Sequence, residues 1–492
     1  MNFEETKPGM HRWWLLVLVS LSFASICGCS DSDLQDESTP LARNVVVIVA
    51  DDLGYVDVSA YNPGGQVRTP NIDRIGATGV RFTDGYVTGA VCSPSRAAML
   101  TGRYQHRFGF EYNAGNAARA DREGLGLDPG ERTIGDVLRS TGMRTAFVGK
   151  WHQGSQDQFY PTDRGYDEFF GFLTGQTAYI DPDVPGAIGV DTPNAPLIPR
   201  SVYSLGQVLR GTDREVVENS GLYLTEEFTR EAVEFIDRNR DRPFYLHVAY
   251  HAPHVPLQTT QKYYDRFPDI ENEARRVLAG MVSAMDDGVG AILKRLERHG
   301  LTEDTLVVYL SDNGCAFVSG ACSCELLRGG KVTVFEGGVR VPYLMQWPRG
   351  IADGQVDDRI VSSLDLLPTI ASAVGVLLPD DRDYDGVDLV PYLSGETPGE
   401  PHDKLFWRAG TAVGAREGDW KLWESRDGDF TFLFDLATDL GEENDLSRER
   451  IDELDSLRAG IENWERGMST PAWGPRESTV STCDGFSANV LF

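Results

Sequence analysis

Two short polar runs in the sequence could together bind a metal ion. Asp51 stands beside Asp52, and Asp312 stands beside Asn313 much further along the chain. Three carboxylates and one amide oxygen form a hard oxygen site that suits Ca²⁺ or Mg²⁺ better than Zn²⁺. Taken alone, an acidic pair is more often a helix cap or a solvated turn, and Asn313-Gly314 is typical of a turn.

A cysteine and several cations could bind an anionic substrate. Cys92 lies two residues before Pro94 and four before Arg96, where a helix-forming stretch begins. Pro94 suits the first turn of a helix, where backbone N–H groups and the helix dipole favour an anion. Lys150 and Lys331 lie beside glycines in motif-like loops, although only seven of the 46 basic residues are lysines. These residues are therefore candidates for an anion site.

Four strand-like runs position most of these polar residues, together with a set of histidines. The runs cover 44–50, 144–149, 243–250 and 305–311 and are rich in β-branched or aromatic residues. They end at Asp51 and Asp52, at Lys150 and His152, at His251 and His254, and at Asp312 and Asn313. Helical patterns lie between the runs, which predicts an α/β sheet with helices on both faces. Ligands of open α/β sheets bind beyond the carboxyl ends of the strands, so these side chains should converge on one crevice. Each histidine alone could equally be a packing group.

Composition predicts one large globular domain and a smaller one. The 492 residues are 41% hydrophobic and 25% charged, which is ordinary for a folded chain but too long for one small core. The formal net charge of −29 excludes nucleic acid as a partner. An anionic substrate must therefore be held by a local basic cluster.

The N-terminal segment has the pattern of an export signal. Basic residues precede an apolar run at 13–26, which has the length of a signal-peptide core and is too short to span a bilayer. The run ends at "ICGC", which resembles the lipobox of bacterial lipoproteins. We expect a lipoprotein signal over 1–29, lipidation of Cys29, and a flexible tether over 30–42. A plain secretory signal is the alternative. Both place the chain outside the cytoplasm, in the periplasm or at the outer membrane or cell surface, and the membrane is contacted through the lipid anchor only.

Motifs spread over most of the chain resemble those of one enzyme family. The run "CSPSRAAMLTGR" resembles the signature of the formylglycine-dependent (type I) sulfatases, members of the alkaline phosphatase superfamily. The resemblance extends from about residue 43 to 470, through "ADDLG", "GKWH", "APHVPL", "SDNG", "LRGGKVTVFEGGVRVP", "REGDWKLW" and "LFDLATDLGEENDLS". It implies a large mixed sheet sandwiched by helices in a catalytic domain at 43–395, and a smaller C-terminal α+β domain with an antiparallel sheet at 396–492.

The resemblance also implies a chemistry for the strand-end residues. In the family, a formylglycine-generating enzyme or maturase oxidises the motif cysteine to formylglycine, so Cys92 should be neither half of a disulfide nor a thiol nucleophile. One Ca²⁺ is expected on Asp51, Asp52, residue 92, Asp312 and Asn313. One hydroxyl of the formylglycine hydrate attacks sulfur, and Arg96 stabilises that hydrate. Lys150 and Lys331 bind the sulfate oxygens. His254 protonates the departing alcohol, and His152 takes the proton that leads to sulfate release.

Ser93 and His251 are also candidates for substrate binding. Ser93 is the second residue of the motif and alternatively caps the helix, whereas His251 alternatively only packs beside the pocket. The sequence departs from the family pattern at Gln153, where leucine is usual, and at Leu440, where proline is usual. Neither residue belongs to the expected chemistry, although Gln153 can alter the pocket wall.

Five cysteines follow the signal segment, and an odd number requires one unpaired or modified cysteine. With Cys92 converted, as the resemblance implies, Cys315, Cys322, Cys324 and Cys483 remain for two disulfides. A bridge between Cys322 and Cys324 would be strained, so we expect Cys483 to pair with one member of the 315–324 cluster.

Two further segments have recognisable patterns. Alternating residues around "VGAREGDWKLW" and "FTFLFDL" predict the antiparallel sheet of the C-terminal domain, closed by a helix from about 447 to 466. Residues 176–222 are rich in proline and have no clear period, which makes them the candidate for a substrate-shaping insertion.

Three functions are compatible with these patterns. The favoured one is a sulfatase acting on a sulfated carbohydrate, because surface lipoproteins of this type commonly serve glycan uptake. The alternatives are a formylglycine-dependent phosphodiesterase or phosphonate hydrolase and an inactive glycan-binding lipoprotein. The sulfatase-like settings of His254 and Lys331 weigh against the former, and the complete set of catalytic residues weighs against the latter.

Overall fold

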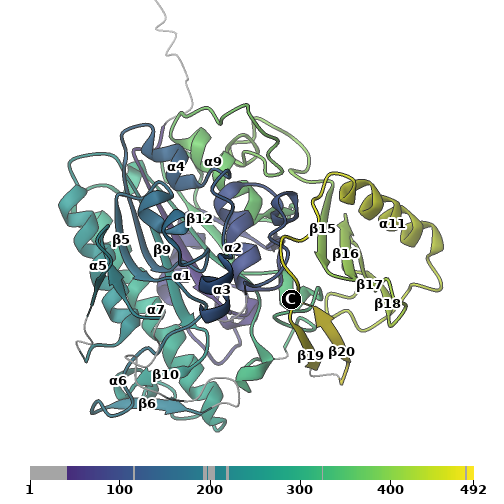
Figure 1. Cartoon of the computed structure of the whole chain (residues 1–492), viewed down its shortest axis with the longest axis horizontal. Coiled ribbons are helices and arrows are strands. Elements are labelled where there is room, and N and C mark those ends of the chain that lie inside the picture. The colour runs from purple at the N-terminus through teal and green to yellow at the C-terminus, as the bar shows by residue number, and fades with distance from the viewer. Residues whose placement is uncertain are drawn as a thin grey trace, which may run out of the picture. The chain divides into compact units, whose positions relative to one another are not determined.

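A ten-stranded mixed sheet carries the polar residues of the predicted site at the carboxyl ends of its central parallel strands (Figure 1). The computed structural model describes residues 41–114, 117–191, 197, 206–217, 221–323, 325–481 and 485–491. The sheet order is β13-β2-β12-β11-β1-β9-β4-β5-β7-β8. In chain order the strands are β1 (Asn44–Asp51), β2 (Val80–Phe82), β4 (Arg144–Lys150), β5 (Glu168–Phe172), β7 (Leu209–Arg210), β8 (Glu215–Val216), β9 (Phe244–Pro253), β11 (Thr305–Ser311), β12 (Tyr343–Gln346) and β13 (Gln355–Asp357). The four strand-like runs of the sequence are thus confirmed as β1, β4, β9 and β11. The predicted signal segment and nearly all of the predicted tether lie outside the described residues.

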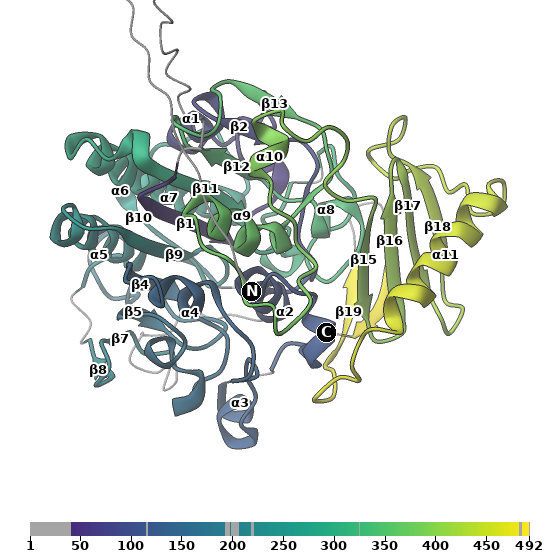
Figure 2. The same ribbon diagram turned by 90° about the horizontal axis from the view of Figure 1, so that it is seen from above.

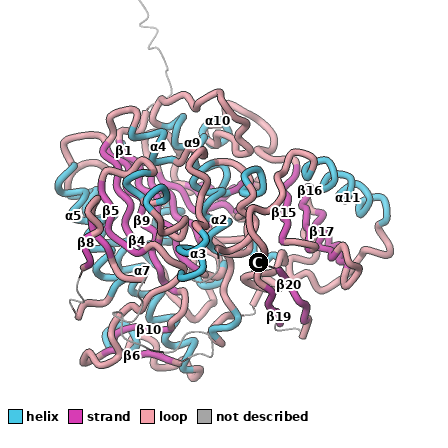
Figure 3. Tube along the Cα trace, in the orientation of Figure 1, coloured by secondary structure: helices cyan, strands magenta, loops and turns pink. Residues whose placement is uncertain are grey.

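Helices cover both faces of the sheet, which confirms the predicted α/β class. They are α1 (Pro70–Ala77), α2 (Cys92–Thr101), α3 (Ala117–Glu123), α4 (Ile134–Arg139), α5 (Leu224–Asn239), α6 (Gln261–Tyr264), α7 (Glu273–Arg298), α8 (Glu336–Val339), α9 (Leu366–Ala373), α10 (Val390–Leu393) and α11 (Ile451–Glu465). Val46 and Ile48 of β1 face a core that includes residues of α1, α5 and α7. Val45 and Val47 face the opposite core, with residues of α2, α4 and α9. Figure 3 shows the strands as a layer among these helices. Among the described residues, no helix combines the length and apolar character needed to cross a membrane.

The register of the parallel strands aligns their carboxyl ends. β1 lies between β11 and β9, and it pairs in parallel with both. Ala50 pairs with Ser311, so Asp51 and Asp312 follow at the same level. A shift in the β1–β9 register leaves Asp51 opposite Pro253, which carries the end of β9 past the acidic residues. Because β1 is buried along its whole length, an apolar run without polar alternation suits it.

The C-terminal part forms a second sheet that confirms the predicted antiparallel arrangement. Strands β15 (Lys404–Ala409), β16 (Ala412–Glu417), β17 (Trp420–Ser425) and β18 (Thr431–Asp435) pair in sequence order. α11 lies across β16–β18 and packs on one face of this sheet (Figure 2), close to the predicted helix at 447–466. The opposite face contributes Trp407 and Trp423 to a core shared with Phe335 and Val339. The domain boundary at residue 396 stays a prediction.

The segment 176–222 contributes short strands despite its lack of period. β6 (Ala187–Val190) pairs with β10 (Leu257–Thr260), whereas β7 and β8 extend the main sheet. Two further pairs complete the strands, β3 (Gly85–Tyr86) with β14 (Val361–Ser362) and β19 (Glu477–Ser481) with β20 (Ser487–Leu491). The role of 176–222 in shaping the substrate pocket stays a prediction.

One disulfide joins Cys315 to Cys322. The predicted partner of this cluster, Cys483, lies outside the described residues, as does Cys324. Of the cluster, only Cys324 is left to pair with Cys483, and their pairing stays a prediction.

A buried ion pair links the C-terminal sheet to the catalytic part. Lys421 of β17 and Glu336 of α8 are both fully buried, and Lys421 Nζ donates to Glu336 Oε1 at 2.6 Å. Arg340 donates to the other carboxylate oxygen at 3.1 Å. Burial raises the pKa of Glu336, but Lys421 and Arg340 outweigh burial and lower it to about 2.

Replacing Lys421 should therefore destabilise the fold. Lys421→Met leaves the Glu336 charge buried with one cation fewer, and we expect a loss of about 3–5 kcal/mol in unfolding free energy. The matched control is Lys404→Met, because Lys404 pairs with Glu417 across the same sheet but at its surface, with side chains 28% and 39% exposed. That variant should lose less than about 1 kcal/mol. Urea unfolding measures both, and equal losses would contradict the role of the buried pair.

Candidate active site

The acidic residues meet at the carboxyl ends of β1 and β11. The Asp52 backbone N–H donates to Asp312 Oδ1 at 3.1 Å, and Asn313 Nδ2 donates to Asp52 Oδ1 at 2.7 Å. Asp51, Asp52, Asp312 and Asn313 are all buried. Asp52 has a φ of 60°, in the left-handed region that a non-glycine residue adopts at a cost. That conformation ends β1 in a sharp turn beside the crevice.

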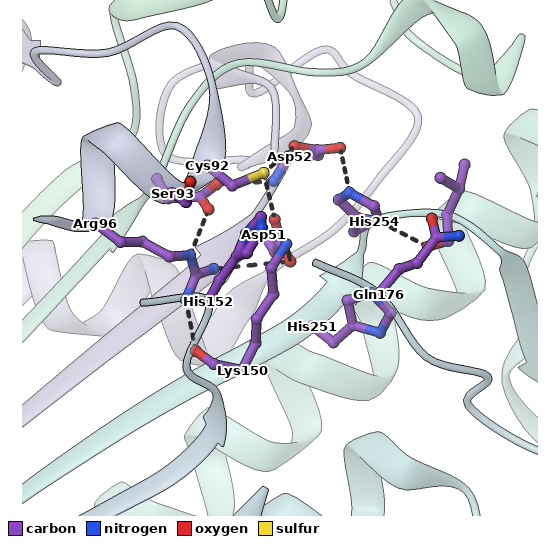
Figure 4. Close-up of polar contacts among 12 residues, drawn as sticks. Asp51, Asp52, Cys92, Ser93, Arg96, Lys150, His152, Gln176, His251 and His254 are labelled. Atoms are coloured by element: carbon purple, nitrogen blue, oxygen red, sulfur yellow. Dashed lines mark hydrogen bonds and ion pairs between the residues drawn. The ribbon is translucent and has the colours of Figure 1, made fainter. Parts of the chain in front are cut away.

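Cys92 is the first residue of helix α2, as the sequence predicts. Its Sγ lies 3.4 Å from Asp51 Oδ1, 3.6 Å from Asp52 Oδ1 and 2.9 Å from Lys331 Nζ (Figure 4). The N-cap residue, Val91, offers no side-chain cap to the first N–H groups of the helix. Cys92 is therefore placed where the helix end, a lysine and two carboxylates meet.

Each carboxylate of the site is paired with at least one cation, and Asp51 also lies 3.7 Å from Arg96. Lys150 Nζ donates to Asp51 Oδ2 at 2.5 Å, Lys331 Nζ to Asp52 Oδ1 at 2.6 Å, and Arg96 Nε to Asp312 Oδ2 at 2.7 Å. Arg96 also donates to the Lys150 carbonyl at 3.0 Å, which ties α2 to the end of β4. These three pairs balance in formal charge.

Lys331 and His254 lie on the more accessible side of the site. Their side chains are 15% and 11% exposed, whereas those of Lys150 and Asp51 are fully buried. A substrate would therefore approach from the side of Lys331 and His254.

Burial and neighbouring charges shift the pKa values of these groups. Burial, together with Asp312, raises the pKa of Asp51 to about 7, against the opposing effects of Lys150 and Arg96. Burial also raises the pKa of Asp52, but Lys331, His254 and Lys150 outweigh it and hold that pKa below its ordinary value. Burial raises the pKa of the Cys92 thiol well above its usual range.

His152 and His254 contribute imidazole rings from two different strand ends. His254 Nδ1 lies 2.6 Å from the Val255 carbonyl, so it acts as the donor there, and Nε2 faces Asp52 Oδ2 at 3.6 Å. His152 follows β4 with a φ of 55°, and its Nδ1 has no hydrogen-bond partner among the described residues. Burial lowers the pKa of both histidines and Lys150 lowers each further, whereas Asp52 opposes this effect at His254.

His251 lies beneath His254, at 1% exposure. Its ring stacks on Tyr179 with centroids 4.5 Å apart and lies 5.1 Å from the ring of His254. Neither ring nitrogen of His251 has a hydrogen-bond partner among the described residues. Figure 4 shows Gln176, the first residue of the segment 176–222, pointing toward His254.

Ser93 is buried, and its contacts run to residues that no motif identifies. Both the hydroxyl and the backbone N–H of Ser93 donate to Asn113 Oδ1, at 3.0 and 3.2 Å. Gln153 Nε2 donates to the carbonyls of Ser93 and His152, at 2.9 and 2.8 Å. The departure at Gln153 thus joins helix α2 to the loop that carries His152. Substrate binding by Ser93 stays a prediction.

The oxygen atoms of the site fit a hard divalent cation. Asp52 Oδ2 and Asn313 Oδ1 are buried and accept no hydrogen bond from the described residues. Atoms of Asp51, Asp52, Cys92 and His254 lie within 4.8 Å of one another. Asp312, by contrast, already accepts from Arg96 and from the Asp52 N–H. The sequence predicted Asp312 and not His254 as a ligand, and the structure brings both to the site.

Comparison with known proteins agrees with this geometry. The family model described as sulfatase matches residues 43–376, and the model described as N-sulphoglucosamine sulphohydrolase, C-terminal, matches residues 330–457. The chain belongs to the sulfatase family. It is a sulfuric ester hydrolase by that membership, and the large mixed sheet with a C-terminal antiparallel sheet is the sulfatase fold.

Several sulfatases are similar over most of this chain. N-acetylgalactosamine-6-sulfatase of Rattus norvegicus is 33% identical, with 78% of this chain and 72% of the relative covered. Arylsulfatase A of Homo sapiens is 36% identical, covering 74% and 70%. The crystal structure of Ps i-CgsB in complex with k-i-k-neocarrahexaose is 32% identical, covers 88% of this chain and 94% of its own, and superposes with a TM-score of 0.78.

Proposed function

We propose that this sulfatase hydrolyses sulfate monoesters of a sulfated polysaccharide or oligosaccharide, using a formylglycine formed from Cys92 and a bound Ca²⁺. The observation that carries the proposal is the burial of residue 92 among three paired carboxylates and three cations at the start of α2. Support for a carbohydrate comes from the relatives, since one is an N-acetylgalactosamine-6-sulfatase and another was crystallised with a neocarrahexaose.

A formylglycine hydrate at position 92 supplies an oxygen nucleophile and a second hydroxyl that allows sulfate to leave. Around that position, Lys150 and Lys331 offer ammonium groups to the sulfate oxygens, and Arg96 holds Asp312 and the end of β4 in place. His254 Nε2 faces the open side beside Asp52, whose charge favours a proton on that nitrogen. In this protonated form His254 is placed to give the Nε2 proton to the leaving oxygen. His152 is placed to accept a proton, because burial keeps its ring neutral.

Residues Asp51, Asp52, Asp312, Asn313 and 92 would hold the metal ion. When bound, Ca²⁺ supplies positive charge that stabilises negative charge developing on the sulfate group. The chain's own charges in the site balance, so a divalent cation would give the crevice a net attraction for an anionic ester.

Formylglycine formation should be visible in the mass of one peptide. Trypsin releases residues 82–96 with Cys92 inside, and protein made with a maturase should give this peptide about 18 Da lighter than its cysteine form. The same protein should release sulfate from 4-nitrophenyl sulfate and from at least one member of a panel of sulfated oligosaccharides. Cys92→Ala should abolish both the mass change and the hydrolysis. An unmodified Cys92 in active enzyme would contradict the formylglycine, and turnover of phosphodiesters without sulfate esters would favour the phosphodiesterase alternative.

Calcium binding should stabilise the folded enzyme. After treatment with a chelator, Ca²⁺ at a hundredfold excess over its Kd should raise the unfolding midpoint by about 2–5 °C, because only the folded chain assembles the ligands. Asn313→Leu removes the buried amide oxygen and should lose this shift. Differential scanning calorimetry measures both proteins. An unchanged shift in the variant would place the calcium elsewhere, and a shift with Mg²⁺ but none with Ca²⁺ would overturn the choice of metal.

We also propose that the enzyme is exported and anchored through a lipid on Cys29. The support is the apolar run at 13–26 followed by the lipobox-like "ICGC". Protein from a host that processes lipoproteins should fractionate with membranes, be released by detergent, and begin at a lipidated Cys29 by mass spectrometry. A Cys29→Ala variant should lose the lipid. A detergent-independent soluble form with an unlipidated N-terminus would favour the plain secretory signal.

A further inference from the structure

Tyr179 lies beneath the turn that carries His251 and His254. It is fully buried, and its hydroxyl lies 2.5 Å from the His251 carbonyl and 2.8 Å from the His254 carbonyl. A phenol has one proton, so the two carbonyls share it in a three-centre hydrogen bond. One hydroxyl therefore holds both ends of the four-residue turn 251–254.

The ring of Tyr179 reaches His254 by a second route. It stacks on the ring of His251 with an interplanar angle of 8°, and His251 in turn stacks on His254 at 30°. Phe172 also packs against His251, in an edge arrangement with ring centroids 5.0 Å apart at 71°. The imidazole of His254 is thus supported from below by a column of packed rings.

Tyr179 is itself anchored to strand β10. Its backbone N–H donates to Gln258 Oε1 at 2.9 Å, and Gln258 Nε2 donates to the Ile180 carbonyl at 2.8 Å. The Tyr179 carbonyl accepts from the backbone N–H of Leu224, at the start of α5. The column of rings therefore stands on a fixed base.

The orientation of His254 depends on this support. Its Nδ1 is held by the Val255 carbonyl, in the residue after the turn, so a movement of the turn would rotate Nε2 away from its position 3.6 Å from Asp52. A displacement of about 1 Å in a proton donor can cost about a hundredfold in rate. Loss of the Tyr179 hydrogen bonds to this turn can therefore have a large kinetic effect.

We propose that Tyr179 is a positioning residue that aims His254 Nε2 at the leaving-group oxygen of the sulfate ester. The inference rests on the proposed function, because it takes His254 as the proton donor. It assigns a specific task to the start of the segment 176–222: this part of the chain supports the proton donor from inside the fold.

The test compares sulfate esters whose leaving groups differ in how much they need to be protonated on departure. The 4-nitrophenolate ion leaves readily without one, whereas an alcohol or a phenol with a high pKa does not. Tyr179→Phe keeps the ring and removes the hydroxyl. We expect kcat to fall about 10–100-fold on phenyl sulfate and on a sugar sulfate, and less than about threefold on 4-nitrophenyl sulfate.

Tyr250→Phe is the matched control. Tyr250 is equally buried in β9, directly before His251, but its hydroxyl meets Thr229 at 2.8 Å. This variant should lose about the same amount on all three substrates. A loss in Tyr179→Phe that is equal on all substrates, or no loss, would overturn the proposal.

A double variant tests whether the effect passes through His254. In a His254→Ala background, Tyr179→Phe should produce no further loss on phenyl sulfate, and an additive loss would overturn the proposal. If Tyr179→Phe does not fold, Gln258→Glu serves instead, because it removes the hydrogen bond that Gln258 Nε2 donates to the Ile180 carbonyl. This variant should show the same dependence of the loss on the leaving group. An equal loss on all substrates would again overturn the proposal. Failure of the wild-type enzyme to hydrolyse any sulfate ester would instead refute the proposed function.

Discussion

Three buried carboxylates can share one crevice because three cations face them. An unpaired buried charge costs several kcal/mol, so Asp51, Asp52 and Asp312 each require a partner. The partners are Lys150, Lys331 and Arg96, and each lies within 2.7 Å of its carboxylate. These six side chains come from different strand ends, from α2 and from the loop before α8. The site therefore exists only when those elements are in register, and residue 92 is placed by the same set of contacts.

The backbone bends at the points where the strands deliver these side chains. Asp52 and His152 both adopt positive φ, and β9 shifts register against β1 just before Asp51. Left-handed conformations of this kind cost about 1–3 kcal/mol each. They persist here because β1 and β4 are buried between neighbouring strands, so the sheet fixes the chain up to the turn. These bends direct the polar side chains into the site, which they would not reach if the strands continued straight.

The C-terminal domain supports the segment that carries Lys331. Glu336 lies five residues after Lys331. Its carboxylate accepts a hydrogen bond from Lys421, and its backbone N–H donates to Glu442. Phe335 packs against Trp423 with ring centroids 4.4 Å apart. On the catalytic side, the Lys331 N–H donates to the Cys315 carbonyl and the Val332 N–H to the Ala90 carbonyl, next to α2. The second domain thus helps to hold a lysine at the mouth of the crevice, although it contributes no side chain to the set of six.

The sequence alone determined the α/β alternation, the four strands and the polar residues at their ends. These follow from local patterns: β1 is a continuous apolar run because it is buried on both faces, and parallel strands must end at one edge. The motif around Cys92 likewise identified the start of a helix. Signals of this kind depend on residues close together along the chain, so they can be recognised without knowledge of the fold.

Tertiary structure alone decided how those residues are paired and supported. Which cation meets which carboxylate, and the presence of His254 close to Cys92, depend on strand register and on the shift in β9. Asn113 and Tyr179 lie in segments without motif or period, and their partners are 20 and more than 70 residues away. No local pattern encodes such contacts. They arise because folding favours a partner for most buried polar groups, and the nearest partner in space can be remote in sequence.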